Sequence, residues 1–284
     1  MWTLEKQSSA CINIRMDAPT RNFEAFFLLS SDRHHDSVHN CTDLELEHLQ
    51  EAVSRQAGIL DFGDLFDGMQ GRDDPRRDPA LDLKAKFANE DYFDAIINDA
   101  VEFYEPFSEN IILLGQGNHE TAVRKKNGVN LTSNLAIRIN ERNNSNIFSG
   151  GYSGWVRFLF KRHGSRQEIR LKWHHGYGGG GGSTKGTSQS MKYAVQNPDA
   201  HIIATGHTHD HWILPIARER LKSNGQVSID EQLHIRCGTY KNEWGDGTEG
   251  WAVEKNISPK PLGAVWLRFF MRNRQIQYEA IRAV

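Results

Sequence analysis

Cysteine and long apolar runs are scarce in this sequence, and each scarcity excludes a class of protein. Cys11, Cys41 and Cys237 are too few and too widely spaced for a disulfide framework or a Cys-x-x-Cys zinc site. No apolar stretch approaches the roughly 18 residues that a membrane span needs. The first twenty residues lack a basic stretch followed by an apolar one, so we expect no secretory signal. These absences predict a cytoplasmic protein that does not associate with membranes.

An excess of charge of one sign is also missing. The sequence has 34 Lys and Arg against 36 Asp and Glu, a formal net charge of −2, which argues against a protein that coats nucleic acid by charge alone. Hydrophobic residues make up 38%, enough to build a core. We expect the 284 residues to form a single domain with its core over about 22–284, and residues 1–21 to be an N-terminal extension.

Apolar runs that end in polar loops set the expected order of elements. They predict strands at 22–31, 58–62, 110–114, 154–162, 168–173, 200–205 and 233–236, and two more around a turn near Asn273 within 261–282. Helical spacing predicts helices at 42–56 and 187–196, and one long helix or two over 81–107. Because strands and helices alternate early in the chain, we expect an α/β fold with partly parallel sheets and a site at the strand ends.

Histidine is abundant, with 13 residues, and several of these lie in polar clusters that directly follow a predicted strand. In chain order, the clusters are Ser31-Asp32-Arg33-His34, Gly63-Asp64-Leu65-Phe66-Asp67, Gly117-Asn118-His119-Glu120, Trp173-His174-His175-Gly176 and Gly206-His207-Thr208-His209. Each cluster alone is weak evidence. Five of them, all at strand ends, are hard to explain by chance.

The donor types in these clusters indicate a site for two metal ions. Residues i and i+2 of an extended segment point to the same side, so Asp32 with His34, and His207 with His209, would each offer two ligands to one place. Carboxylate and imidazole without thiolate suit Mn, Fe, Co, Ni or Zn. One carboxylate can bridge two cations about 3.5–4 Å apart. Asn118 would add a neutral oxygen ligand, which limits the negative charge around the ions.

The ordered set D-x-H, G-D-x-x-D, G-N-H-E, H and G-H-x-H resembles the calcineurin-like metallophosphoesterase superfamily. That superfamily includes protein phosphatases, purple acid phosphatases, cyclic-nucleotide phosphodiesterases and nuclease subunits of DNA repair. The motifs span residues 32 to 209, most of the chain. The resemblance implies a four-layer α/β sandwich of two mixed β-sheets flanked by helices, with the site at the strand ends.

The resemblance also implies the ligands of two divalent transition-metal ions, for which we expect Mn²⁺. Asp32, His34 and His209 would hold the first ion, and Asp64 would bridge the pair. Asn118, His207 and one histidine of the His174-His175 pair would hold the second. The superfamily has one histidine where this chain has two, and of these we favour His174.

His119 and Asp67 receive catalytic roles from the same resemblance. His119 would face the phosphate and donate a proton to the leaving oxygen, and the Asp67 carboxylate would hold its ring, because a carboxylate partner fixes the imidazole tautomer. The implied nucleophile is a hydroxide that bridges the ions, so no covalent phospho-enzyme is needed.

Substrate contacts are the least specific part of the prediction. Arg76 and Arg77 in the charged loop 71–79 could bind a phosphate group, as could Lys185 in the glycine-rich loop 176–186, which could form a mobile lid. We expect a phosphodiester substrate in nucleic acid or a nucleotide. The alternatives are a phosphomonoesterase that acts on a protein or a small molecule, and a non-catalytic metal-binding scaffold.

Overall fold

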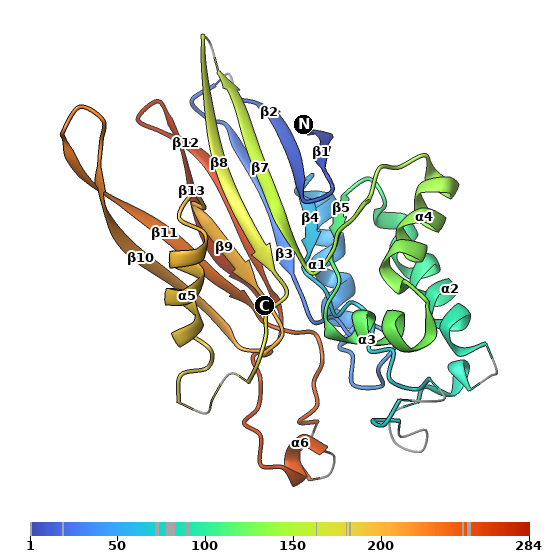
Figure 1. Cartoon of the computed structure of the whole chain (residues 1–284). Coiled ribbons are helices and arrows are strands. Elements are labelled where there is room, and N and C mark those ends of the chain that lie inside the picture. Colours follow the sequence, from blue (N-terminus) through green and yellow to red (C-terminus); the bar gives the residue numbers. More distant parts are fainter. Residues whose placement is uncertain are drawn as a thin grey trace.

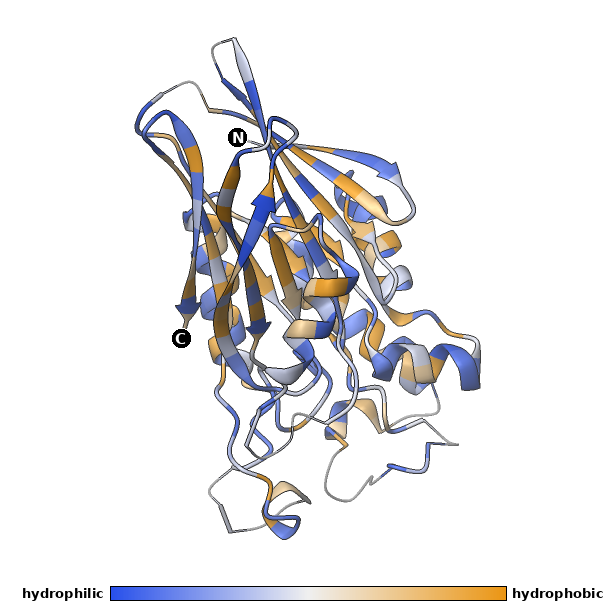
Figure 2. Ribbon diagram, turned by 60° about the vertical axis from the view of Figure 1, so that its left-hand side comes forward, coloured by the Kyte–Doolittle hydropathy of each residue, from blue (hydrophilic) through white to orange (hydrophobic). Residues whose placement is uncertain are grey.

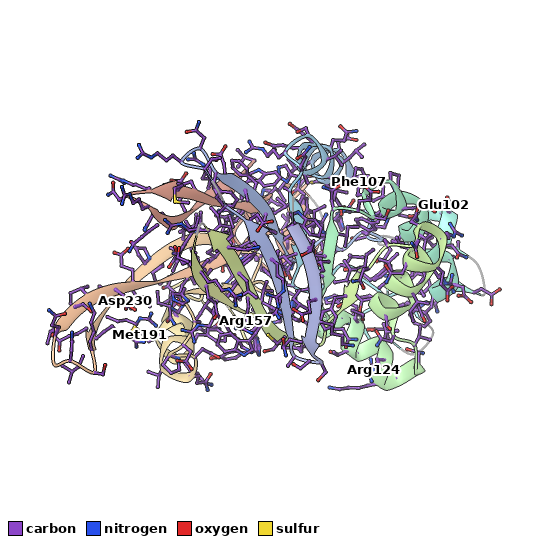
Figure 3. The ribbon with its side chains drawn as sticks, turned by 90° about the horizontal axis from the view of Figure 1, so that it is seen from above. Glu102, Phe107, Arg124, Arg157, Met191 and Asp230 are labelled. Atoms are coloured by element: carbon purple, nitrogen blue, oxygen red, sulfur yellow. The ribbon has the colours of Figure 1, made fainter. Side chains whose placement is uncertain are left out.

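Two β-sheets pack face to face at the centre of the molecule, and helices cover their outer faces (Figure 1). The structure is a computed structural model that describes residues 2–18, 20–71, 74–77, 83–88, 91–162, 164–179, 181, 183–245, 247–248 and 251–284. Viewed from above, the sheets lie between the helix that carries Met191 and the helices that include Glu102 (Figure 3). The expected four-layer α/β sandwich is confirmed.

One sheet contains the strands that lead to the first three motifs. Its order is β13-β12-β3-β4-β5-β6, and β3 to β6 run parallel. The strands are β3 (Glu24–Ser30), β4 (Gly58–Asp61), β5 (Ile111–Leu114), β6 (Phe148–Ser149), β12 (Ala264–Arg272) and β13 (Gln275–Ala283). Because parallel strands end at the same edge, the loops after β3, β4 and β5 meet there.

The other sheet has the order β1-β2-β7-β8-β9-β11-β10. Its strands are β1 (Trp2–Ser8), β2 (Cys11–Asp17), β7 (Ser153–Arg162), β8 (Ser165–His174), β9 (Ile202–Thr205), β10 (His211–Leu221) and β11 (Val227–Cys237). The sequence predicted 233–236 as a strand but missed the long hairpin that β10 and β11 form together. β8 and β9 run parallel, so the fourth and fifth motifs also end at one edge.

The N-terminal residues belong to the core, which corrects the expected boundary at residue 22. β1 pairs with β2, and β2 adds a parallel strand to β7. Ile12, Ile14 and Met16 are buried in the layer between the two sheets. The segment alternates apolar and polar residues as a half-buried strand does, and this is the signal that the sequence analysis overlooked.

Most of the helices pack on the outer faces of the sheets, whereas α6 (Trp251–Glu254) lies beyond the strand ends (Figure 1). The others are α1 (Thr42–Ser54), α2 (Tyr92–Tyr104), α3 (Asn118–Asn127), α4 (Leu131–Asn143) and α5 (Ser188–Gln196). α1, α2 and α4 pack on the sheet that contains β3 to β5, and α5 packs on the other sheet. Apolar residues are frequent along the central strands (Figure 2), and many of their side chains are buried. No helix in the described part of the chain is both long and apolar enough to cross a bilayer.

The predicted helix over 81–107 is only partly present. Its second half forms α2, and short 3₁₀ turns occupy Ala85–Phe87 and Glu105–Phe107. Residues 81–82 and 89–90 lie outside the described residues. The helices at 42–56 and 187–196 are confirmed as α1 and α5, with small changes at their ends.

Candidate metal centre

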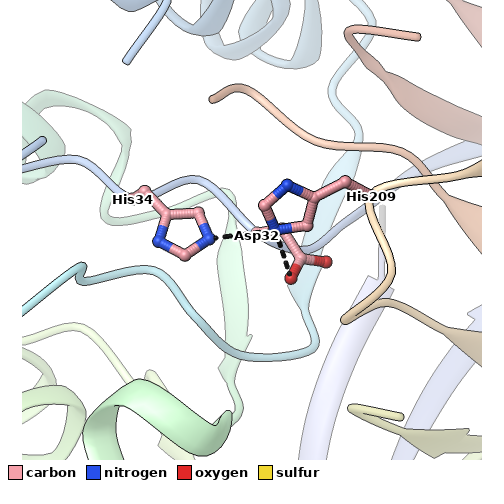
Figure 4. Close-up of side chains that lie close together, drawn as sticks. All are labelled: Asp32, His34 and His209. Carbon is pink, nitrogen blue, oxygen red and sulfur yellow. Dashed lines mark hydrogen bonds and ion pairs between the residues drawn. The ribbon is translucent and has the colours of Figure 1, made fainter. Parts of the chain in front are cut away.

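Asp32, His34 and His209 form the first donor cluster at the strand ends (Figure 4), and His34 also belongs to a group of possible donors with Asp67 and His119. Nε2 of His209 lies 3.3 Å from Nε2 of His34 and 3.5 Å from Oδ1 of Asp32. Asp32 and His34 are 0% and 1% exposed, so these donors are buried together. Among the described residues, Oδ1 of Asp32 has no hydrogen-bond partner. A buried carboxylate oxygen without a partner is costly unless a cation binds it.

Asp64, His175, His207 and Asn118 form the second cluster. Nε2 of His175 lies 3.1 Å from Oδ2 of Asp64 and 3.1 Å from Oδ1 of Asn118. Nδ1 of His207 lies 2.7 Å from the same Asn118 oxygen. The two clusters adjoin, because the main-chain N–H of His207 donates to Oδ2 of Asp32 at 2.8 Å.

Hydrogen bonds behind the histidine rings leave one nitrogen of each ring free for a metal. Nδ1 of His34 lies 2.9 Å from Oδ1 of Asp67, and Nδ1 of His175 lies 3.1 Å from the carbonyl oxygen of Phe62. Since both acceptors require a proton on Nδ1, the lone pair of each neutral ring lies on Nε2, which faces its cluster. Such partners are the usual support of metal-binding histidines. The donor set therefore fits two transition-metal ions.

The main chain brings these donors together by a route that differs from the expected one. Asp32, His34, His207 and His209 all have positive φ, at 54°, 47°, 75° and 57°, as does Asp64 at 53°. The segments are therefore not extended. Asp32 and His34 share one cluster as expected, whereas His207 and His209 belong to different clusters, so the expectation that these two offer ligands to one place is wrong. Residues other than glycine rarely adopt a left-handed backbone conformation, and those that do are concentrated at functional sites.

Two glycines of the motifs are required by close approach of the ligand side chains. A Cβ at Gly117 would lie 2.0 Å from Oδ1 of Asp64, and one at Gly206 would lie 2.5 Å from Oδ2 of Asp32. Any side chain at either position would displace a donor carboxylate. This explains in physical terms why G-N-H and G-H-x-H begin with glycine.

The structure brings His175, and not the favoured His174, into the second cluster. His175 is 0% exposed and lies within the second cluster. His174 is the last residue of β8, and its ring lies among Tyr152, Tyr177 and Tyr193. Its Nδ1 accepts from the main-chain N–H of Gly176 at 2.9 Å. Neighbouring residues at a strand end point to opposite faces, so only one of the two reaches Asp64.

In both clusters, neighbouring charges shift the pKa values of the donor side chains in the direction opposite to the effect of burial. Burial would raise the pKa of Asp32, but His209 and His175 lower it to about 2. Burial would lower the pKa of His175, but Asp64 raises it to about 9. The pKa of Asp64 is held well below its ordinary value, against burial, by His175 and His119. The carboxylates are therefore ionised and ready to bind cations.

His119 and Asp67 meet in a way that the sequence did not predict. Nδ1 of His119 lies 2.6 Å from the main-chain oxygen of Asp67, and its distance to the Asp67 carboxylate is 3.8 Å. That carboxylate instead contacts His34 and Nζ of Lys241, the latter at 2.9 Å. Two positively polarised partners draw the carboxylate away from His119. In this structure His119 therefore hydrogen-bonds the Asp67 carbonyl, and the Asp67 carboxylate lies at 3.8 Å from the same ring nitrogen.

Lys241 is a site residue that the sequence analysis missed. It is 5% exposed, and its ammonium group also pairs with Glu243 at 2.9 Å. The Thr239 hydroxyl and the Tyr240 N–H, just before it, both bond the main-chain oxygen of Asp32. Lys241 follows the predicted strand 233–236, so the rule that sites lie in the loops after strands could have found it.

Three buried carboxylates stabilise the loops that carry the metal donors. Glu120 accepts the main-chain N–H groups of Asp64, Phe66 and Gly117 at 3.1, 3.0 and 2.7 Å. Asp36 accepts the N–H of Asp67 at 2.6 Å and that of Gly68 at 3.0 Å. Glu45 pairs with buried Arg33 at 2.7 Å. These contacts fix the loops that carry the donors, and no sequence motif marks Asp36 or Glu45.

A cleft of about 740 Å³ opens onto the two clusters. Of the three predicted phosphate-binding residues, Arg76 lines it, whereas Arg77 and Lys185 are not among its described lining residues. Gly178 and Gly179 of the glycine-rich loop also border it. Positions 72–73 and 78–79 of the charged loop, and 180 and 182 of the glycine-rich loop, lie outside the described residues.

Comparison with known proteins agrees with this geometry. The family model for calcineurin-like phosphoesterases matches residues 27–211, which include every motif. A search of curated proteins found no match. Similar solved structures include a predicted phosphoesterase of Streptococcus pneumoniae (13% identity, TM-score 0.34, 92% of this chain and 91% of that one). They also include Vacuolar Protein Sorting 29 of Cryptosporidium parvum (13%, 0.38, 92% and 98%) and a metallophosphoesterase of Sphaerobacter thermophilus (14%, 0.36, 91% and 89%).

Proposed function

Because the chain belongs to the calcineurin-like phosphoesterase family, we propose that it is a metal-dependent phosphodiesterase. The observation that carries the proposal is the pair of adjoining donor clusters at the base of a cleft, with His119 beside them. Asp32, His34 and His209 would hold one ion, and Asn118, His175 and His207 the other. Asp64 would bridge the pair. The family motifs assign Asp64 this role, and its position in the second cluster, beside His175, supports it.

Two divalent transition ions, for which we favour Mn²⁺, would acidify the attacking water and neutralise the phosphoryl oxygens when bound. The chain itself holds the donors at fixed positions through Asp67, Phe62 and the Glu120 brace. Preorganised donors need no rearrangement as charge develops, and this is the main source of catalysis at such sites.

We propose that His119 donates a proton to the leaving oxygen. Its Nδ1–H donates to the main-chain oxygen of Asp67, so the ring is fixed and Nε2 remains for the substrate. Nε2 lies 3.9 Å from Oδ2 of Asp64, next to the proposed bridge. In the cationic ring, Nε2–H would protonate the departing alkoxide or phenolate.

The charge of the cleft favours a diester over a monoester. Each Lys or Arg that lines the described part of the cleft already has a carboxylate partner at 2.9 Å: Arg76 with Asp74, Lys241 with Asp67 and Glu243, and Lys260 with Asp210. A monoester carries about one charge more than a diester near neutral pH. The cleft offers that extra charge no unpaired lysine or arginine.

Hydrolysis of paired substrates tests this function. The protein is stripped with a chelator and reloaded with Mn²⁺, and its rates on bis(p-nitrophenyl) phosphate and p-nitrophenyl phosphate are compared alongside elemental analysis. We expect two ions per chain, turnover that depends on them, and a higher kcat/KM for the diester. A higher kcat/KM for the monoester would identify a phosphomonoesterase. Two bound ions without turnover of either compound would identify a metal-binding scaffold.

A further inference from the structure

The described residues of the segment 242–260 (242–245, 247–248 and 251–260) form a wall of the cleft that the family motifs do not explain. They follow β11, include α6 and lie beyond the strand ends (Figure 1). The segment lies outside residues 27–211, which match the family model. We call it the cleft wall.

The cleft wall brings apolar surface to a site whose floor is polar. Trp244, Ala252, Ile257 and Pro259 line the cleft on this side. The same cleft is also lined by His34, His119, His207 and His209, which form its polar floor. A phosphoester bound at the floor would therefore place one of its organic groups against the wall. A cleft of about 740 Å³ is within the usual range for small-molecule sites.

Trp244 gives the wall a flat aromatic surface. Its side chain is half-buried, and the Gly247 N–H donates to the Trp244 carbonyl at 2.9 Å. A Cβ at position 247 would lie 3.0 Å from the indole Nε1, so glycine there allows its main chain to lie close to the ring. Aromatic side chains that line nucleotide-binding sites bind bases by stacking, which does not require base-specific hydrogen bonds.

The cleft lacks the features that a polymer groove requires. Nucleic acid binds chiefly through several unpaired Lys and Arg side chains, each of which releases counterions from one phosphate. In the described part of this cleft, Arg76, Lys241 and Lys260 are paired with carboxylates, and Glu243 adds a negative charge to the lining. The site is suited to one phosphate group and not to a row of them.

We propose that the cleft wall selects a compact phosphodiester that carries a planar aromatic group, as a nucleoside does, with Trp244 as its stacking surface. This inference depends on the proposed phosphodiesterase function and assigns its substrate class. It excludes long nucleic acid as the preferred substrate. The recognised unit is a single nucleotide-sized diester.

Two substrates with the same leaving group separate recognition from chemistry. Thymidine 5′-(p-nitrophenyl phosphate) carries a nucleoside on the retained side, and methyl p-nitrophenyl phosphate carries a methyl group there. We expect Trp244→Ala to lower kcat/KM for the thymidine compound about 10-fold, mainly through KM, and to change the methyl compound less than about 3-fold. Val253→Ala is the matched control, because Val253 lies in α6 and is not among the described residues that line the cleft.

An equal loss on both substrates, or no loss on either, would overturn the role of Trp244 while leaving the phosphodiesterase function intact. Binding provides a readout that does not depend on turnover. Thymidine 5′-monophosphate should quench the tryptophan fluorescence of the Mn²⁺-loaded wild type, and Trp244→Ala should lose most of that quench. If the wild type turns over neither diester, the phosphodiesterase function fails. An absent quench would then overturn the nucleotide pocket separately.

Salt dependence tests the exclusion of a polymer. A site that contacts several phosphates loses about 10³-fold in affinity between 50 and 200 mM salt. We expect the KM of the thymidine substrate to rise less than about 3-fold over that range. A 20-nucleotide single strand that competes more than 10-fold better than thymidine 5′-monophosphate, with a steep salt dependence, would overturn the compact-substrate assignment.

Discussion

The floor of the cleft and the cleft wall are held in different ways. On the floor, the main chain around Asp32 and His34 is bonded to other loops: Asp32 N to Gly63 O at 2.9 Å, His34 N to Asp64 O at 3.0 Å, and Tyr240 N to Asp32 O at 3.0 Å. In the wall, the bonds are largely local, as from Gly247 N to Trp244 O and from Ile257 N to Ala252 O. The floor is fixed by the fold, whereas the wall can vary without disturbing it. We therefore expect chemistry to fail at the floor and selectivity to change at the wall.

Asp64→Asn should give the largest effect on the floor. The substitution removes the charge proposed to lie between two dications, where electrostatic interactions in a buried site are strong. We expect loss of at least one ion per chain and near-complete loss of turnover, with the circular-dichroism spectrum unchanged. Elemental analysis beside the rate on bis(p-nitrophenyl) phosphate checks both. A variant with two ions and a normal rate would remove Asp64 from the centre.

The adjacent histidines offer a matched pair of substitutions. His175→Ala deletes a proposed ligand at the second cluster, and we expect loss of its ion and a rate loss of about 10³-fold or more. His174→Ala should bind two ions and keep its rate within about 3-fold, because its ring contacts tyrosines outside the clusters. Metal content and kcat of the two variants are measured together. Equal effects would contradict the assignment.

The sequence predicted which residues would gather but not how they are held. Strand-end position was enough to predict that Asp32, His34 and His209 gather, although β3 and β9 belong to different sheets, because the two packed sheets place the ends of these strands at the same end of the sandwich. It could not choose between His174 and His175, since that choice depends on which face of the last β8 residues turns inward. The sequence also could not predict the partners of the Asp67 carboxylate, because one of them, Lys241, is 174 residues away in the chain.

His119→Asn should leave both ions in place and lower the rate by about 10²–10⁴, the usual contribution of a positioned proton donor. The loss should shrink for substrates with good leaving groups, because a stable phenolate needs little protonation. Rates on a series of aryl methyl phosphates with leaving-group pKa values from about 7 to 10 check this dependence. A loss that is constant across the series, or a lost ion, would exclude the general-acid role.

Asp67→Asn distinguishes the observed contacts from the expected dyad. Because the carboxylate contacts His34 and Lys241, we expect metal affinity to fall about 10–100-fold, as for other partners of ligand histidines. The leaving-group dependence should remain that of the wild type, since the Asp67 carbonyl still holds His119. Combined with His119→Asn, the rate losses at saturating metal should multiply. A double variant whose rate loss is no larger than that of His119→Asn alone would support the expected dyad, in which the Asp67 carboxylate acts through His119.

The pH dependence of metal binding should give the smallest effect, and it tests the charge of the second cluster. In the metal-free protein, Asp64 raises the pKa of His175 to about 9, so at pH 7 the ring holds a proton that a metal must displace. The affinity of the second site should therefore rise about tenfold per pH unit between pH 6.5 and 8.5, with one proton released per ion. His174 does not compete over this range, because burial lowers its pKa to about 4. Titration calorimetry in two buffers of different ionisation enthalpy counts the released protons. An affinity that stays flat across this range would mean that His175 is neutral before the metal binds and that Asp64 does not control it.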